Sequence, residues 1–281
     1  MSTQHDPVIG LAAGVPFVAV PPATGPRSSA PVVVAWHLLD PPRTEAAFAA
    51  ALPLAGLDAW RIYLGLPMTG SRLPAGGWDE LMRLATEDAV RALHGPIATQ
   101  AAAEFEDAFA RLRDDLDLGD GPVGLVGGSI GAAVAQLVLT ESAVPVRAAV
   151  LVSPVVQLRP VVEEMGRLFG ATYPWSQASL AVADRLDFVA RADEIAGRGG
   201  PAVLLVVGGQ DDADGFLAPA QRLQDALASR YADPDRARLH VVAGMGHALA
   251  AEPGIEPAPQ TPEAAEVDRL ATDWLCQHLA A

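Results

Sequence analysis

The sequence contains no lysine and no asparagine, and Cys276 is its single cysteine. Without lysine, neither a Schiff-base nucleophile nor a serine–lysine dyad can operate, and without asparagine a cysteine–histidine–asparagine triad is excluded. One cysteine cannot form an internal disulfide or a cysteine-based metal cluster. These absences remove several covalent and metal-dependent mechanisms.

Basic residues are also scarce. The chain has 19 of them, all arginine, against 34 acidic residues, which gives a formal net charge of −15. Nucleic-acid and anionic-membrane binding need a basic footprint, so we expect neither partner. No apolar run reaches about 18 residues, and the first arginine is Arg27, so we expect no membrane span, no secretory signal and a cytoplasmic location.

The 281 residues, 51% of them hydrophobic, suffice for one large core. Short apolar runs alternate with helical stretches, which predicts a single α/β domain with a mostly parallel sheet flanked by helices on both faces. Residues 1–10 read as a loose arm. The predicted strands are 15–20 at an edge, 32–36, 59–64, 123–126, 148–152, 202–207 and 238–242. The first predicted helix starts at Thr44 and ends near Leu52. The other predicted helices span 78–93, 97–116, 184–196, 217–231 and 263–279.

The connection between the strands at 148–152 and 202–207 is longer than one crossover helix requires. Its excess, residues 155–180, contains a helical stretch and then Tyr173, Pro174 and Trp175. Two interpretations fit this segment: a small cap over the functional site, or a packing helix followed by an irregular tail.

A G-x-S-x-G pattern, residues 127–131, joins the strand at 123–126 to a helix of small residues. A nucleophilic serine needs such a tight turn, and side chains at Gly127 or Gly131 would collide with the adjoining strand or helix. The turn would present the Ser129 hydroxyl at the carboxyl edge of the sheet. The pattern alone also fits a tightly packed glycine turn without chemistry.

Two further candidates follow later strands. Asp211 lies just after the strand at 202–207, and His247 lies after the strand at 238–242. A serine hydroxyl needs a histidine base and an acid that orients this base, and both must reach the same sheet edge. Asp212 and Asp214 lie on the same loop as Asp211, so a shift of one residue would exchange the acid.

The order Ser129, Asp211, His247, with each residue just beyond a strand, resembles that of the α/β-hydrolases. The resemblance extends from about Val15 to the end of the chain, and within the family it points to the dienelactone hydrolase-like and prolyl oligopeptidase-like branches. It implies that Ser129 is the nucleophile, His247 the general base and Asp211 the orienting acid.

The same resemblance implies an oxyanion hole made by two backbone amides. One is that of Ile130, and the other follows the strand at 32–36, where the family usually has a His-Gly pair. This chain has His37-Leu38 instead, so the donor would be Leu39, or Leu38 if the loop is shifted. Leucine does not readily adopt the positive φ open to glycine. We expect Leu38, Trp175 and Phe216 to line an apolar substrate pocket.

These residues predict a serine hydrolase that cleaves a small-molecule carboxylic ester with an apolar acyl group, without cofactor or metal. A thioesterase or a small peptidase would share the machinery, and a non-catalytic binding module on the same fold is the alternative from another class. The sequence allows more than one oligomeric state, and a homodimer is among them.

Overall fold

The computed structural model describes residues 6–27, 29–168 and 170–280. Its centre is an eight-stranded sheet with the order β1-β2-β4-β3-β5-β6-β7-β8, in which β1 and β2 run antiparallel to their neighbours and the remaining pairs are parallel. The strands are β1 (Val8–Ala12), β2 (Val15–Val20), β3 (Val32–Trp36), β4 (Trp60–Leu64), β5 (Val123–Gly128), β6 (Val146–Val152), β7 (Ala202–Gly208) and β8 (Ala237–Val242). The predicted mostly parallel α/β sheet is confirmed.

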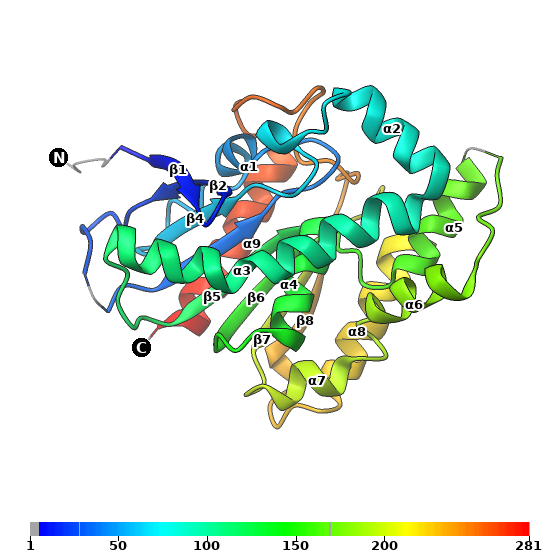
Figure 1. Cartoon of the computed structure of the whole chain (residues 1–281). Helices are drawn as coiled ribbons and strands as arrows, with labels where there is room; N and C mark the ends of the chain where they lie inside the picture. The colour runs from blue at the N-terminus through cyan, green and yellow to red at the C-terminus, as the bar shows by residue number, and fades with distance from the viewer. Residues whose placement is uncertain (1–5, 28, 169, 281) are drawn as a thin grey trace.

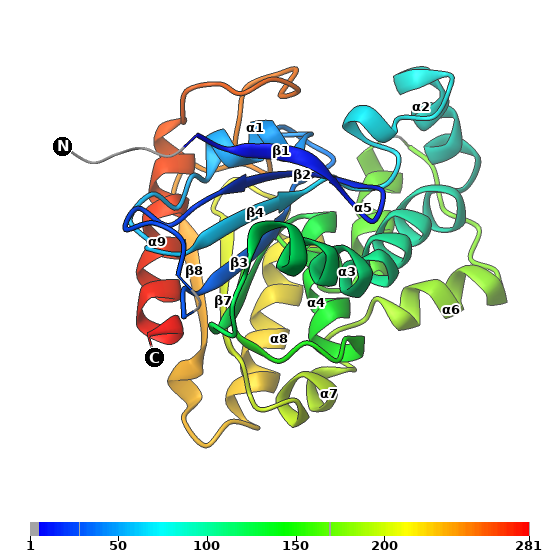
Figure 2. The same ribbon diagram turned by 60° about the vertical axis from the view of Figure 1, so that its left-hand side comes forward.

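Helices cover both faces of this sheet. Helices α1 and α9 lie on one side, and α3, α4 and α8 lie on the other (Figures 1 and 2). Among the described residues, no helix has the length and hydrophobicity to cross a membrane. The α-helices are α1 (Glu45–Ala51), α2 (Gly77–Asp88), α3 (Gly95–Leu116), α4 (Ile130–Glu141), α5 (Leu158–Leu168), α6 (Gln177–Arg185), α7 (Ala192–Gly197), α8 (Ala218–Ala228) and α9 (Pro262–Leu279). Short 3-10 turns are η1 (Gly70–Arg72) and η4 (Pro234–Arg236), and π-helical turns are η2 (Ala89–His94) and η3 (Ala213–Leu217).

Strand β3 shows why its sequence is a continuous apolar run. Val32, Val34 and Trp36 point into the core beneath α3 and α4, whereas Val33 and Ala35 point into the core beneath α1 and α9. All five residues are buried. Because successive side chains alternate between the two faces, a strand covered on both sides must be apolar throughout.

The edge of the sheet differs from the prediction. Residues 8–10, expected in a loose arm, belong to β1, and β2, expected at the edge, pairs with both β1 and β4. Of the rest of the predicted arm, the structure describes Asp6 and Pro7. Residues 1–5 lie outside the described ranges. Ile9 is 76% exposed and Leu11 66% exposed. A five-residue strand that buries so little gives a weak sequence signal.

Two helix predictions are corrected. The single helix expected over 184–196 is divided, because α6 ends at Arg185 and α7 starts at Ala192. The break expected at Gly95-Pro96 lies earlier, at Asp88, whose backbone is extended (φ −159°, ψ 90°) and whose side chain caps η2, whereas η2 runs directly into α3. Pro96 lies in the first turn of α3, where its fixed φ near −65° is already that of a helix.

The long connection after β6 leaves the sheet and returns through a narrow neck. Leu158 N–H donates to the Leu186 carbonyl oxygen (3.2 Å), and Phe188 N–H donates to that of Val156 (3.0 Å). Between these bonds, Gln157 and Asp187 form an antiparallel bridge. The segment between the two sides of the neck carries α5 and α6, so it extends beyond residue 180. In both views it lies beside α2 at one end of the molecule (Figures 1 and 2).

Candidate active site

Ser129 occupies a strained turn between β5 and α4. Its φ is 48° and its ψ is −114°, a conformation that costs a non-glycine residue about 1–3 kcal/mol. A Cβ at Gly127 would lie less than 3 Å from backbone atoms of Gly131 and Ala132, and one at Gly131 would lie less than 3 Å from the Trp36 and His37 carbonyl oxygens. The steric reason predicted for both glycines is confirmed.

A chain of hydrogen bonds connects Ser129, His247 and Asp211. The Ser129 hydroxyl lies 2.8 Å from His247 Nε2, and His247 Nδ1 lies 2.9 Å from Asp211 Oδ2. A carboxylate only accepts, so Nδ1 donates to Asp211 and Nε2 is free to accept the serine proton. The Asp211 side chain is 3% exposed and that of His247 is 20% exposed. The three residues come from the carboxyl ends of β5, β7 and β8.

The structure distinguishes Asp211 from the neighbouring carboxylates. Asp211 Oδ1 accepts from the Asp212 N–H (2.8 Å), which holds the side chain in place while Oδ2 faces His247. The Asp212 side chain instead accepts from the Gly215 N–H at the start of η3. Asp214 is 78% exposed and lies 3.5 Å from Arg167. Asp211 therefore faces the histidine, as its position in the sequence predicts.

The loop after β3 adjoins the start of α4, as the close approach at Gly131 shows. As the first residue of α4, Ile130 has a backbone N–H with no partner inside the helix. Leu39 is half-buried on the adjoining loop, and neither Leu38 nor Leu39 has a positive φ. The loop thus forms without the glycine that the family pattern would place there.

The His37 side chain holds this loop in place through hydrogen bonds. Its ring is fully buried, and burial lowers its pKa to about 4, against the opposing effect of its bond to the Leu38 carbonyl. Nδ1 donates to that carbonyl (2.7 Å), so the neutral Nε2 accepts from the Leu66 N–H (3.3 Å). His37 therefore ties the loop after β3 to the loop after β4. In the sequence, His37 stands out only as the histidine of the family's His-Gly pair, in which Leu38 replaces the glycine.

No protein-family model matches this chain, and no curated protein matches it. Its structure is similar to that of TT1662 from Thermus thermophilus, with 18% identity, a TM-score of 0.68 and 98% of each chain covered. A puromycin-hydrolyzing peptidase from Mycobacterium tuberculosis is 19% identical with a TM-score of 0.64, over all of this chain and 40% of that one. A dienelactone hydrolase from Anabaena variabilis ATCC 29413 is 18% identical with a TM-score of 0.56, over 98% of this chain and all of that one.

The chain has the α/β-hydrolase fold. Esterase and lipase structures are also among those it resembles, with TM-scores of 0.54 and 0.57. In the α/β-hydrolase fold the carboxyl edge of the parallel strands is where functional side chains gather, and here that edge carries Ser129, Asp211 and His247.

One residue expected in the substrate pocket of this α/β-hydrolase fold lies elsewhere. Leu38 is fully buried in the core beneath α1 and α9, and it fills the space that a Cβ at Gly128 would need. The prediction that Leu38 lines the pocket is wrong, because this side chain turns away from the site into the core.

The other two predicted pocket residues are half-buried. The Phe216 ring lies 4.3 Å from the His247 imidazole, tilted by 44°, so it borders the site directly. Trp175 packs edge-on against Tyr173 at 4.7 Å, and the Arg159 guanidinium lies 5.5 Å from its ring centre. Trp175 therefore belongs to the segment beyond the neck, and its contact with substrate stays a prediction.

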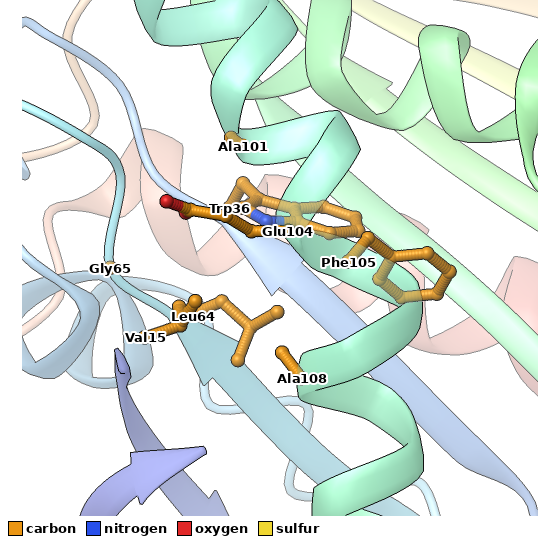
Figure 3. Close-up of a pocket in the computed structure, with 8 residues that line it drawn as sticks. All are labelled: Val15, Trp36, Leu64, Gly65, Ala101, Glu104, Phe105 and Ala108. Carbon is orange, nitrogen blue, oxygen red and sulfur yellow. The ribbon is translucent and has the colours of Figure 1, made fainter. Parts of the chain in front are cut away.

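Two hollows elsewhere in the structure are separate from this site. Figure 3 shows a cleft between α3 and the sheet that leaves no room for a water molecule. A larger hollow of about 230 Å³ lies near Val146 and Pro201, at the amino ends of β6 and β7. Neither is lined by a residue of the hydrogen-bonded chain. In the described part of the chain, no group of three or more potential ligand side chains is placed to hold a metal ion.

Two residues near the site were not among the predicted site residues. Asp40 Oδ2 lies 3.7 Å from His247 Nε2. Arg43 donates through Nε to the Leu39 carbonyl oxygen (2.9 Å) and through Nη1 to the Pro253 carbonyl oxygen (2.6 Å). Their nearness to the end of β3 is the only sequence signal that could have marked them.

Proposed function

We propose that the protein is a serine hydrolase that cleaves carboxylic esters through an acyl-enzyme intermediate. The observation that carries this proposal is the chain of hydrogen bonds from Ser129 through His247 to Asp211, built on a strained turn at the sheet edge. A merely structural turn needs neither the strain nor a histidine within 2.8 Å of the serine hydroxyl.

The geometry supports a two-step reaction. His247 Nε2 accepts the proton of Ser129 as the Oγ attacks the acyl carbonyl, and Asp211 stabilises the resulting imidazolium through Nδ1. The backbone amides of Ile130 and Leu39 bind the oxyanion. His247 then protonates the leaving alcohol, and a water molecule activated by the same imidazole releases the acid.

An activity-based probe tests this proposal. The protein is treated with a fluorophosphonate, the adduct is located by peptide mass spectrometry, and hydrolysis of p-nitrophenyl acetate, butyrate and octanoate is measured. We expect labelling at Ser129, and we expect Ser129→Ala to abolish labelling and hydrolysis while the circular dichroism spectrum is unchanged. A wild-type protein that is folded but neither labelled nor active would favour the non-catalytic binding module.

Ser153 provides a matched control. It also follows a central strand with a positive φ of 40°, it is fully buried, and its hydroxyl has no hydrogen-bond partner among the described residues. Ser153→Ala should therefore keep both labelling and hydrolysis. Thioesters and aminoacyl p-nitroanilides assayed beside the esters would rank the thioesterase and peptidase alternatives by kcat/KM.

A further inference from the structure

Asp40 places a second carboxylate beside the reactive nitrogen of His247. Its Oδ2 lies 3.7 Å from Nε2, the atom that is also 2.8 Å from the Ser129 hydroxyl. Asp211 contacts the opposite nitrogen, Nδ1. The imidazole is therefore flanked by two carboxylates, of which only Asp211 is buried: the Asp40 side chain is 53% exposed.

Asp40 has no arginine partner among the described residues, in which the imidazole of His247 is the group that lies within 4.0 Å of its carboxylate. The basic residue nearest in sequence, Arg43, directs its side-chain donors to the Leu39 and Pro253 carbonyl oxygens and to Glu252. The negative charge of Asp40 is thus open to solvent and to whatever occupies the space in front of His247.

That space belongs to the leaving group of the proposed reaction. His247 Nε2 takes the proton from Ser129 and passes it to the departing oxygen, so this oxygen must come within hydrogen-bond distance of Nε2. A carboxylate 3.7 Å from Nε2 lies within a few ångströms of the first atoms of the leaving alcohol. A positive charge two or three bonds from the ester oxygen would be attracted to it.

An aromatic ring borders the same imidazole. Phe216 lies 4.3 Å from it by ring centres and is only partly buried. Aromatic faces attract quaternary and protonated amines, and an adjacent carboxylate adds charge attraction. The site therefore presents both groups that recognise an organic cation.

From these contacts, and resting on the proposed ester hydrolysis, we propose that Asp40 is a specificity-determining residue that selects esters of amino alcohols, whose leaving group carries a protonated or quaternary amine close to the ester oxygen. The acyl group remains uncharged. An anionic leaving group is disfavoured by the same carboxylate.

Two esters of equal shape test this selection. Butyrylcholine and 3,3-dimethylbutyl butyrate differ in one atom, a quaternary nitrogen in place of a quaternary carbon. We expect kcat/KM to favour the cationic ester by about tenfold at low salt, because water screens most of the Coulomb attraction to a half-exposed carboxylate. The preference should shrink as ionic strength rises, because the carboxylate is half-exposed.

The variant Asp40→Asn should lower the ratio of the two kcat/KM values about tenfold, whereas Asp40→Glu should retain most of it. Asp120→Asn is the control for net charge: Asp120 is 95% exposed and precedes the amino end of β5, away from the site. It should leave the ratio unchanged. A role of Asp40 confined to the imidazole would change both esters equally and would leave the ratio as it is.

The possible failures are distinguishable. Hydrolysis of both esters by the wild type with equal kcat/KM overturns the selection and leaves the proposed hydrolase intact. A ratio that Asp40→Asn does not change assigns any preference to other groups and also overturns it. Hydrolysis of neither ester, together with absent fluorophosphonate labelling, overturns the selection and the proposed function together.

Discussion

Arg43 Nε donates a hydrogen bond of 2.9 Å to the carbonyl oxygen of Leu39. The same guanidinium bonds to Pro253 and Glu252 on the loop that follows His247, and the Arg43 N–H donates to the Gly254 carbonyl oxygen (2.7 Å). One side chain thus joins the loop of the proposed oxyanion donor to the loop of the proposed base.

Replacing this side chain should impair activity more than it impairs folding. We expect Arg43→Ala to lower kcat by about tenfold or more, since removing support from an oxyanion donor weakens a contribution worth about 10²- to 10³-fold. Arg43→Lys should not restore the rate, because lysine lacks the planar fork that reaches several acceptors. Arg269→Ala, on the exposed side of α9, is the control. Equal kcat values for Arg43→Ala and the control would refute the positioning role.

Replacing Asp211 and replacing Asp212 should have different effects on catalysis. Asp211→Asn should lower kcat by about 10³- to 10⁴-fold, because the amide no longer holds the imidazole in the tautomer that accepts from Ser129. Asp212→Asn should retain most of the activity, and its loss of charge at the start of η3 should cost at most about 1 kcal/mol of stability. Steady-state kinetics and urea unfolding of both variants measure the difference, and a greater kcat loss in Asp212→Asn would exchange their roles.

Gly131, two residues after the proposed nucleophile Ser129, should tolerate no side chain. A Cβ at Gly131 would meet the Trp36 and His37 carbonyl oxygens, which are backbone atoms of β3 and its loop and cannot move aside cheaply. We expect Gly131→Ala to destabilise the protein by about 3 kcal/mol or more and to reduce labelling of Ser129. At Gly197 a Cβ would meet nothing within 4 Å, so Gly197→Ala should have little effect on the midpoint of thermal unfolding.

Two buried histidines should make the protein sensitive to acid. Burial lowers the pKa of His94 to about 4, as it does for His37, and neither ring nitrogen of His94 has a hydrogen-bond partner among the described residues. The unfolded chain takes up protons below about pH 6.5, whereas the folded chain does so only near pH 4. Stability should therefore fall as the pH drops from 6.5 to 4, by about 3 kcal/mol for each histidine.

His94→Leu should remove one of these two contributions. We expect its free energy of unfolding in urea to decline less than that of the wild type between pH 7.5 and pH 4.5. His240→Gln is the control, because the His240 side chain is 43% exposed on β8. Identical pH slopes for wild type and His94→Leu would show that His94 does not oppose its own protonation in the fold.

The sequence predicted β5 and β7 because both strands are buried on both faces and are therefore continuous apolar runs. Ser129 and Asp211 follow these runs at the carboxyl edge, whereas β8, which precedes His247, is a partly exposed strand at the edge of the sheet. The direction in which a loop side chain points cannot be predicted from such a run. Leu38 follows β3 as closely as Leu39 does, but it turns into the core, and only the packing against Gly128 reveals this.

Relations between separate loops were also beyond the sequence. Asp40 and His247 are far apart in the chain, and nothing in either segment indicates that their side chains lie 3.7 Å apart. The π-helical turn η2 lies almost wholly in residues predicted as an ordinary helix, and η3 lies mostly in residues predicted as a loop; η2 packs against α6 and η3 against α5.

The narrow neck at Gln157 and Asp187 makes the segment with α5 and α6 an exchangeable module. Its two ends are hydrogen-bonded neighbours, so inserting, shortening or replacing what lies between them changes neither the length of a strand nor the spacing of the strand ends. Evolution, or an engineer, can thus alter this segment in one step while Ser129, Asp211 and His247 keep their positions.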